Sequence, residues 1–126
     1  MAKALRYNDG KPKMAYILKF PKAMEAVARV KEFGAAKYFE DNWKQGKKPD
    51  SEYLNSAMRH LFAREAGEIY DQDSGCSHIG HAIWNLLAFI ELNHPEETCD
   101  PVVFNERCAF WDSKKVNDEQ SDSILP

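Results

Sequence analysis

Apolar residues recur along this chain with the period of an α-helix. Three stretches follow that period, at about residues 21–38, 51–66 and 77–93. Pro21 suits the first turn of the first helix, and Ser77 is a favourable N-cap for the third. No stretch alternates apolar and polar residues as a half-buried strand would. The pattern therefore predicts an all-α fold, a compact bundle of three to four helices.

The segments outside these helices carry turn signals and mixed composition. Residues 3–22 are expected to be irregular, and Asp50 or Ser51 offers an N-cap for the second helix. Beyond Pro95, the apolar residues can form a short helix or an extended arm, whereas the polar residues 113–126 are expected to be disordered. We therefore expect residues 1–95 to form the helical domain and residues 96–126 to form a C-terminal arm and tail.

The third predicted helix carries a line of polar residues on an otherwise apolar surface. At about 100° per residue, His78, His81 and Asn85 fall within a sector of roughly 60°. The other directions are apolar, so we expect this helix to be buried on most sides. An unpaired buried polar group costs about 1–3 kcal/mol, so these side chains need partners. The first two helices offer too little covering surface, which favours completion of the bundle by oligomerisation.

Carboxylates follow the apolar stripe of the second predicted helix. That stripe consists of Leu54, Ala57, Met58, Leu61 and Phe62. Glu65 falls near its middle, and Glu68 joins the same side if the helix continues. Buried carboxylates stay charged only beside a cation or hydrogen-bond donors, so Glu65-x-x-Glu68 favours a divalent metal site. The alternative is a rim position for Glu65, paired with Arg64.

Composition narrows the class of protein. With 126 residues, 44% hydrophobic and 29% charged, the chain is typical of one soluble domain. A net charge of −3 without a basic block argues against binding a nucleic-acid polymer. Neither an apolar stretch of about 18 residues nor a signal-peptide core occurs, so a cytoplasmic location is expected. The three cysteines form no C-x-x-C pair and are expected to be reduced thiols.

Several spaced motifs occur in one order from about Arg6 to Leu92. They are Arg6-Tyr7-Asn8-Asp9-Gly10-Lys11-Pro12, Glu32-Phe33-Gly34-Ala35-Ala36-Lys37-Tyr38, Asn42-Trp43, Arg59-His60-Leu61, Gly67-Glu68, Asp71-x-Asp73-Ser74-Gly75 and His78-x-x-His81-Ala82-x-x-Asn85. In these motifs the chain resembles the phage dATP/dGTP diphosphohydrolases, small MazG-like nucleotide pyrophosphohydrolases. The resemblance implies hydrolysis of dGTP or dATP to the monophosphate and pyrophosphate in phage nucleotide metabolism, within the host cytoplasm. It also implies a Mg²⁺ or Mn²⁺ cofactor, and we expect a homo-oligomer, either a dimer or a tetramer.

The resemblance and the residue chemistry together suggest roles for individual side chains. The expected metal ligands are Glu65, Glu68, Asp71, His78 and His81. The expected catalytic residues are Glu32, Glu68 and His78. The residues expected to bind substrate are Lys11, Lys37, Tyr38, Asn42, Trp43, Arg59, His60 and Asn85. Among these, the cationic side chains would neutralise phosphates and the aromatic ones would stack on the purine.

One departure from the MazG-like pattern concerns the metal. Typical MazG-like enzymes carry E-x-x-D on the helix after E-x-x-E, whereas this chain has His78-x-x-His81 there. A site with two histidines accepts manganese, iron, cobalt or zinc more readily than a site built only from carboxylates, which favours magnesium.

Two other functions fit the same residues. In the first, the chain is a non-catalytic helical module that binds metal or nucleotide, and metal would stabilise it without triphosphate turnover. In the second, it is an interaction protein whose polar residues pair across an oligomer interface, without metal. A phosphohydrolase of the HD type is disfavoured because the chain contains no His-Asp dipeptide.

Overall fold

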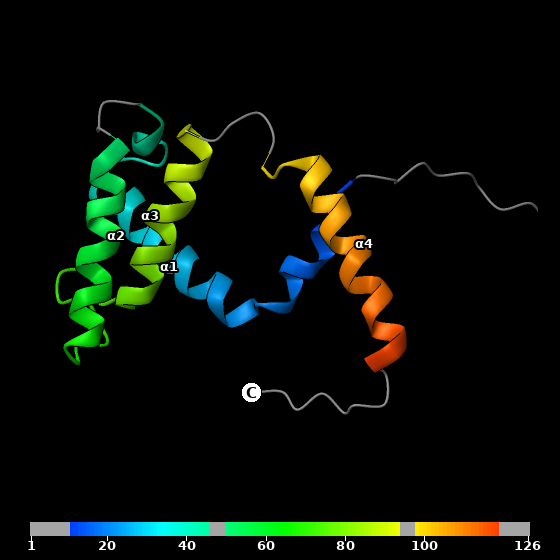
Figure 1. The fold of residues 1–126 in the computed structure, drawn as a ribbon. Coiled ribbons are helices and arrows are strands. Elements are labelled where there is room, and N and C mark those ends of the chain that lie inside the picture. The colour runs from blue at the N-terminus through cyan, green and yellow to red at the C-terminus, as the bar shows by residue number, and fades with distance from the viewer. Residues whose placement is uncertain (1–10, 46–49, 94–97, 119–126) are drawn as a thin grey trace, which may run out of the picture. The chain divides into compact units, whose positions relative to one another are not determined.

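The computed structural model describes residues 11–45, 50–93 and 98–118, and its regular elements there are all helices (Figure 1). Four of them are α-helices: α1 (Pro21–Lys37), α2 (Asp50–Glu65), α3 (His78–Asn93) and α4 (Pro101–Asp118). Two are 3₁₀-helices: η1 (Met14–Lys19) and η2 (Asn42–Gln45). The predicted all-α class is confirmed. The chain divides into two compact units, residues 1–92 with α1 to α3 and residues 93–126 with α4.

Several predicted boundaries were wrong. The 3₁₀-helix η1 lies where irregular structure was expected, and α2 already includes Asp50, so its N-cap position lies outside the described residues. Residues 3–10 of the segment expected to be irregular lie outside the described residues as well. Residues 113–118, expected to be disordered, continue α4. Local pairing supports that turn of helix, because Lys115 contacts Asp112 at 3.0 Å and the Ser113 hydroxyl donates to the Phe110 carbonyl.

Helices α2 and α3 form an antiparallel hairpin. Tyr53 near the start of α2 meets Trp84, with ring centroids 6.5 Å apart, while His60 meets His78 at the start of α3. A Schellman motif ends α2: the Gly67 N–H donates to Arg64 O and the Glu68 N–H donates to Ala63 O. The motif needs a left-handed residue, and Gly67 has a φ of 106°. This turn carries Glu68 to the start of α3.

The start of α3 is anchored in the connecting loop. The Ser77 hydroxyl accepts a hydrogen bond from the Gly80 N–H at 3.1 Å, which confirms Ser77 as the cap. The His78 N–H donates to the Ile69 carbonyl at 3.0 Å, and Tyr70 and Ser77 form an isolated antiparallel bridge. The first turn of α3 therefore has a defined position relative to the end of α2.

Helices α1 and α3 approach closely at Gly80. A Cβ atom at this glycine would lie 3.0 Å from the carbonyl oxygen of Ala26 in α1. The buried apolar residues of the described chain are mostly small: Val27, Val30, Tyr53, Ala57, Ala82 and Ala88. Small side chains let helix backbones come close.

The apolar stripe predicted for the inner side of α2 is largely exposed. Leu54, Met58, Leu61 and Phe62 are 39–67% exposed, and Glu65 is exposed too. Ala57 is the member of the stripe that is buried, together with Tyr53, which the predicted stripe did not include. Periodicity defines the angle between side chains but does not decide which face another helix covers, so the prediction was wrong about the covered face.

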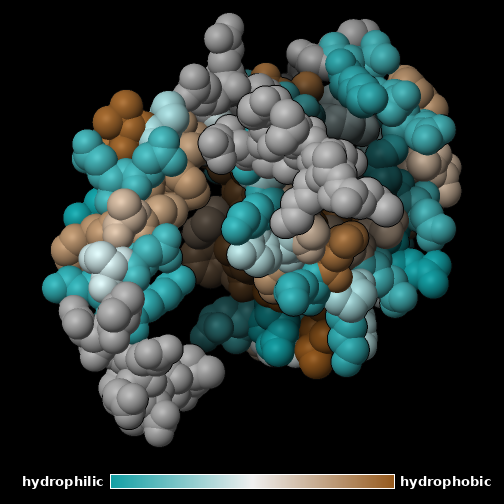
Figure 2. All heavy atoms as spheres, turned by 90° about the vertical axis from the view of Figure 1, so that its right-hand side faces the viewer, coloured by the Kyte–Doolittle hydropathy of each residue, from teal (hydrophilic) through white to brown (hydrophobic). Residues whose placement is uncertain are grey.

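Helix α3 is also less buried than predicted. Its residues Ile79, Leu86, Leu87 and Ile90 are 39–52% exposed. Apolar side chains reach the surface among hydrophilic ones in the space-filling view as well (Figure 2). No helix among the described residues has the length and apolar character needed to cross a membrane. Cys76, Cys99 and Cys108 are free thiols, as expected.

Candidate functional site

Three histidines converge between α2 and α3. The His60 ring of α2 stacks on His81 of α3, with centroids 4.4 Å apart and planes within 6° of parallel. On another side of His60, its Nδ1 lies 2.8 Å from Nδ1 of His78. His78 is only 4% exposed, whereas the other two rings are half-buried. The hairpin thus places imidazoles from distant positions in one polar cluster.

Glu68 holds the far side of the His78 ring. Its Oε1 lies 3.0 Å from Nε2 of His78, directly after the Schellman turn. A carboxylate accepts only, so this contact favours the tautomer with the proton on Nε2 of His78. Nδ1 of His78 then carries a lone pair and accepts a hydrogen bond from His60.

A second carboxylate is held by the loop between the helices. The Ser74 N–H and hydroxyl oxygen each lie 2.9 Å from Oδ2 of Asp71, and the same hydroxyl lies 2.6 Å from Nε2 of His81. Gly75, with a φ of 73°, lets the loop turn back so that its N–H donates to the Asp71 carbonyl. Asp71 and His81 are therefore oriented by one serine.

The cluster fits a divalent metal ion. Donor atoms of His60, Asp71 and His78 all lie within 4.8 Å of one another, and among the described residues these three form the candidate metal group. Metals bind neutral imidazole and ionised carboxylate. Burial, and next the charges that His81 and His78 would carry, lower the pKa of His60 to about 4. Burial also lowers the pKa of His81.

Asp71 is kept ionised by its neighbours. Burial raises the pKa of this carboxyl, but the hydrogen bonds from Ser74 and the nearby histidines outweigh burial and bring the pKa below its ordinary value. At neutral pH the cluster thus presents uncharged His60 and His81 imidazoles beside a carboxylate, the protonation states that a cation requires.

A cleft of about 510 Å³ opens beside the cluster. This volume lies within the range of roughly 300–1,000 Å³ typical of small-molecule sites.

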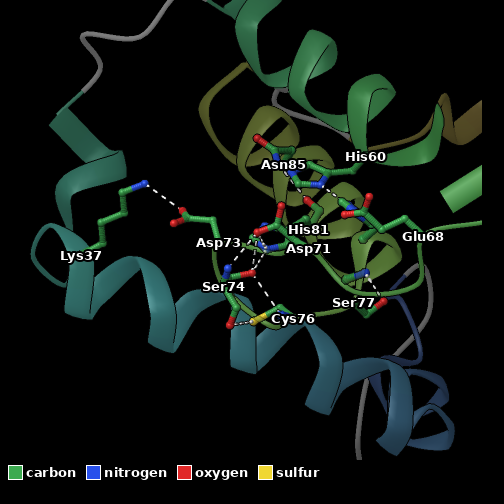
Figure 3. A network of polar contacts seen from close by, with 12 residues as sticks. Lys37, His60, Glu68, Asp71, Asp73, Ser74, Cys76, Ser77, His81 and Asn85 are labelled. Carbon is green, nitrogen blue, oxygen red and sulfur yellow. Dashed lines mark hydrogen bonds and ion pairs between the residues drawn. The ribbon is translucent and has the colours of Figure 1, made fainter. Parts of the chain in front are cut away.

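Among the residues that line the cleft, Lys37 extends toward Asp73 and pairs with it at 3.2 Å (Figure 3). This hydrogen bond and the attraction of the carboxylate raise the pKa of Lys37. The Trp43 indole N–H is buried without a hydrogen-bond partner among the described residues. His60 and Asp71 also line the cleft, so the cleft and the cluster share side chains.

The structure brings most predicted site residues together. The cleft is lined by nearly all residues expected to bind substrate: Lys37, Tyr38, Asn42, Trp43, Arg59, His60 and Asn85. Lys11 is exposed and is not among the lining residues. Of the expected metal ligands, Asp71 and His78 belong to the candidate metal group, whereas Glu68 and His81 lie in the polar network beside it. The exposed Glu65 lies outside the candidate metal group too.

One residue expected to be catalytic lies away from the cleft. Glu32 is exposed, pairs with Arg29 at 3.1 Å and does not line the cleft. Asn85, expected to bind substrate, donates to the main-chain carbonyl of His81 at 2.8 Å. His60, also expected to bind substrate, belongs to the candidate metal group.

Two contributors escaped the sequence analysis: His60 as a metal donor, and Ser74. A signal for His60 exists, because it shares a helical face with Tyr53 and Ala57. The sequence analysis missed this signal because the larger apolar residues Leu54, Met58, Leu61 and Phe62 favoured a neighbouring face of the helix.

Fold and site define an all-helical domain with a histidine–carboxylate cluster of metal-binding type beside a nucleotide-sized cleft. The chain belongs to the dATP/dGTP diphosphohydrolase N-terminal domain family, whose model matches residues 1–101. A dATP/dGTP diphosphohydrolase of Salmonella phage PMBT28 is 31% identical over 96 residues, which cover 76% of this chain. The chain spans about a third, 32%, of the length of that relative. No solved structure matches this chain.

Proposed function

We propose that the chain hydrolyses purine deoxynucleoside triphosphates, dGTP or dATP, to the monophosphate and pyrophosphate with the help of a divalent metal. One observation carries this proposal: the candidate metal cluster and the cleft share His60 and Asp71. A ligand in the cleft would therefore lie against the metal position. Family membership and the name of the phage relative support the choice of nucleotide.

The cleft residues suit the parts of a nucleotide. Lys37 and Arg59 supply positive charge for the phosphates, as a compact ammonium and as a planar fork. Tyr38 and Trp43 supply aromatic surface for the purine, and the unpartnered Trp43 N–H is a donor for an acceptor atom on its edge. Asn42 adds an amide able to donate and accept.

In the proposed reaction, a water oxygen forms a bond to the α-phosphorus, and the bond from that phosphorus to the bridging oxygen breaks. Pyrophosphate leaves with the electron pair. His81 is the imidazole of the cleft that lies outside the candidate metal group, so it is available to accept the proton of the water. A divalent ion held by His60, Asp71 and His78 would neutralise phosphate charge.

Product analysis tests the proposal. The protein is incubated with each of the four deoxynucleoside triphosphates and with Mg²⁺, Mn²⁺, Co²⁺ or Zn²⁺, and the products are separated by ion-exchange chromatography. We expect monophosphate and pyrophosphate from dGTP and dATP. Inorganic triphosphate would indicate HD-type chemistry instead, and no turnover with any metal would refute the enzymatic function.

A second candidate function is a non-catalytic helical module that binds metal or nucleotide. The family model that matches the chain is that of an N-terminal domain, and the match covers 32% of the phage relative that carries the enzyme name, which favours this alternative. In this case calorimetry would detect dGTP binding to the metal-loaded protein, whereas no monophosphate would form.

We also propose that the domain forms a homo-oligomer, a dimer or a tetramer. The exposed apolar stripe of α3, Ile79, Leu86, Leu87 and Ile90, and that of α2 offer surface for a second copy. Light scattering coupled to size-exclusion chromatography measures the mass, and a monomer at high concentration would contradict this part of the proposal.

A further inference from the structure

His78 is held at both ring nitrogens. Nε2 lies 3.0 Å from Oε1 of Glu68, and Nδ1 lies 2.8 Å from Nδ1 of His60. The ring is 4% exposed, whereas the Glu68 side chain is 44% exposed at the edge of the cluster. The Glu68 carboxylate, the His78 ring and the His60 ring therefore form a chain of contacts, with Glu68 at its exposed end.

We propose that the domain binds a transition-metal ion through Nδ1 of His60, Nδ1 of His78 and the carboxylate of Asp71. In the same proposal, Glu68 is a positioning residue that acts through His78 and is not a ligand. This inference deepens the proposed function by naming the class of metal and the ligand set, and its catalytic meaning rests on that function.

The distances support two imidazole ligands on one ion. At a metal–nitrogen distance of roughly 2.0–2.1 Å, adjacent ligand nitrogens lie roughly 2.9 Å apart at an octahedral angle and roughly 3.4 Å apart at a tetrahedral angle. The observed 2.8 Å between the two Nδ1 atoms is close to the octahedral value, and a tetrahedral ion needs the two rings to separate by about 0.5 Å. Without metal, the Nδ1–H of His60 donates a hydrogen bond to the unprotonated Nδ1 of His78. An ion bound to both Nδ1 atoms would take the place of that proton, and the neutral His60 ring would then carry its proton on Nε2.

The role of Glu68 follows from the same geometry. Histidines that bind a metal commonly donate their other ring N–H to a carboxylate, which fixes the tautomer and the ring orientation. Glu68 makes this contact to Nε2 of His78 and leaves Nδ1 facing His60 and Asp71. Ser74 acts similarly on Asp71, because it engages Oδ2 and leaves the other carboxylate oxygen for an ion.

The ligand chemistry selects among divalent cations. Imidazole nitrogen suits Zn²⁺, Co²⁺, Fe²⁺ and Mn²⁺, whereas Mg²⁺ prefers oxygen ligands and keeps its waters. Two nitrogen donors out of three therefore predict tighter binding of Zn²⁺ and Co²⁺ than of Mg²⁺. A site formed by Glu65 and Glu68 would show the opposite preference.

Metal titration of the full chain, without nucleotide, tests this selectivity. Protein treated with a chelator and desalted is titrated with ZnCl₂, CoCl₂, MnCl₂ and MgCl₂ in a calorimeter, and thermal unfolding is followed by circular dichroism. We expect one Zn²⁺ or Co²⁺ ion per chain, a raised melting temperature and at least 100-fold weaker binding of Mg²⁺. Equal or tighter binding of Mg²⁺, or no binding of any ion, would overturn the inference.

Variants separate the positioning residue from the ligands. His60→Gln should reduce Zn²⁺ affinity more than 100-fold. Glu68→Ala should weaken it about 10- to 100-fold, as the loss of an orienting carboxylate does. Glu68→Gln keeps an acceptor for the Nε2–H of His78 and should restore most of the affinity. The exposed Glu91→Gln on α3 is the matched control.

The outcomes remain separable from those for catalysis. If Glu68→Gln is as damaging as Glu68→Ala while its circular dichroism stays native, Glu68 binds the metal directly and the positioning role is wrong. Zn²⁺ or Co²⁺ binding without turnover of any nucleotide would leave this inference intact and refute only the enzymatic function.

Discussion

Single residues decide the protonation of this site. In the cluster, His60 contacts both His78 and His81, and these contacts form without an additional proton on any ring. Burial and the proximity of other histidines disfavour the charged form of His60, and Ser74 favours the charged form of Asp71. Without a bound cation, His60 and Asp71 therefore already have the protonation states that cation binding requires.

The lowered pKa of His60 predicts a pH-dependent stability. In the unfolded chain the imidazole takes up a proton near pH 6.5, but in the folded state only near pH 4. Between these values the unfolded state binds more protons, so the free energy of unfolding falls as pH drops from about 6.5 to about 4. Urea unfolding at intervals across this window measures the slope.

His60→Gln is the control for that experiment. It removes the contribution of His60 and should flatten the slope, leaving the part due to His81, whose pKa is lowered in the same direction. A variant as steep as the wild-type protein would show that His60 does not carry the effect.

Removing the positive charge of Lys37 tests the proposed substrate binding. Lys37→Gln removes a cation of the cleft that, in the proposed function, contacts phosphate in the ground state and in the transition state alike. We expect KM for dGTP to rise about tenfold with little change in kcat, the result of losing uniform binding. Steady-state kinetics measure both, and Lys22→Gln, an exposed change in the first turn of α1, is the control. An unchanged KM would place the phosphates elsewhere.

Among the elements, the hairpin of α2 and α3 positions the site. The Schellman turn at Gly67 aims Glu68, and the Ser77 cap with the Ile69 carbonyl fixes the first turn of α3, where His78 lies. Helix α1 closes the arrangement by crossing α3 at Gly80. Backbone hydrogen bonds at the ends of helices thus set the distances between side chains of the cluster.

Two helical glycines should respond oppositely to the same substitution. At Gly80, an added Cβ would press on the Ala26 carbonyl at 3.0 Å, whereas at Gly34 nothing lies within 4 Å. Alanine favours a helix over glycine by roughly 0.5–1 kcal/mol. We expect Gly34→Ala to stabilise by about 0.5 kcal/mol and Gly80→Ala to destabilise by about 1 kcal/mol, because overpacking outweighs the helix preference.

Chemical denaturation of both variants measures these changes. Because each adds one methyl group to a helix, Gly34→Ala controls for the change in the unfolded state. A Gly80→Ala protein more stable than the wild type would show that α1 can shift away from α3 at no net cost.

At the scale of the whole molecule, the unit of residues 1–92 has more apolar surface than its described residues cover. The described residues bury few large side chains, while α2 and α3 each expose an apolar stripe. The double variant Leu61→Gln/Ile90→Gln should reduce self-association at least tenfold, as measured by sedimentation equilibrium. The helical circular dichroism should stay native, since both side chains are substantially exposed. Unchanged association would exclude this surface as the interface.

Much of the fold could be predicted from the sequence because its signals are local. Pro21 marked the start of α1, and Ser77 marked the start of α3. The shared face of His78, His81 and Asn85 follows from helical geometry alone. By contrast, the helical state of residues 113–118 was missed, because charged composition predicted disorder while local pairs support the helix.

The sequence by itself determined the helices, the line of polar residues on α3 and the motifs that mark the family. Only the tertiary structure decided that His60 faces that line, that Glu68 grips His78, and that Glu65 and Glu32 lie apart from the cluster. The physical reason is that periodicity relates side chains within one helix. Which face becomes buried depends on how closely another backbone approaches. Here α1 approaches α3 at Gly80, whereas the larger side chains of the α2 stripe, Leu54, Met58, Leu61 and Phe62, stay exposed.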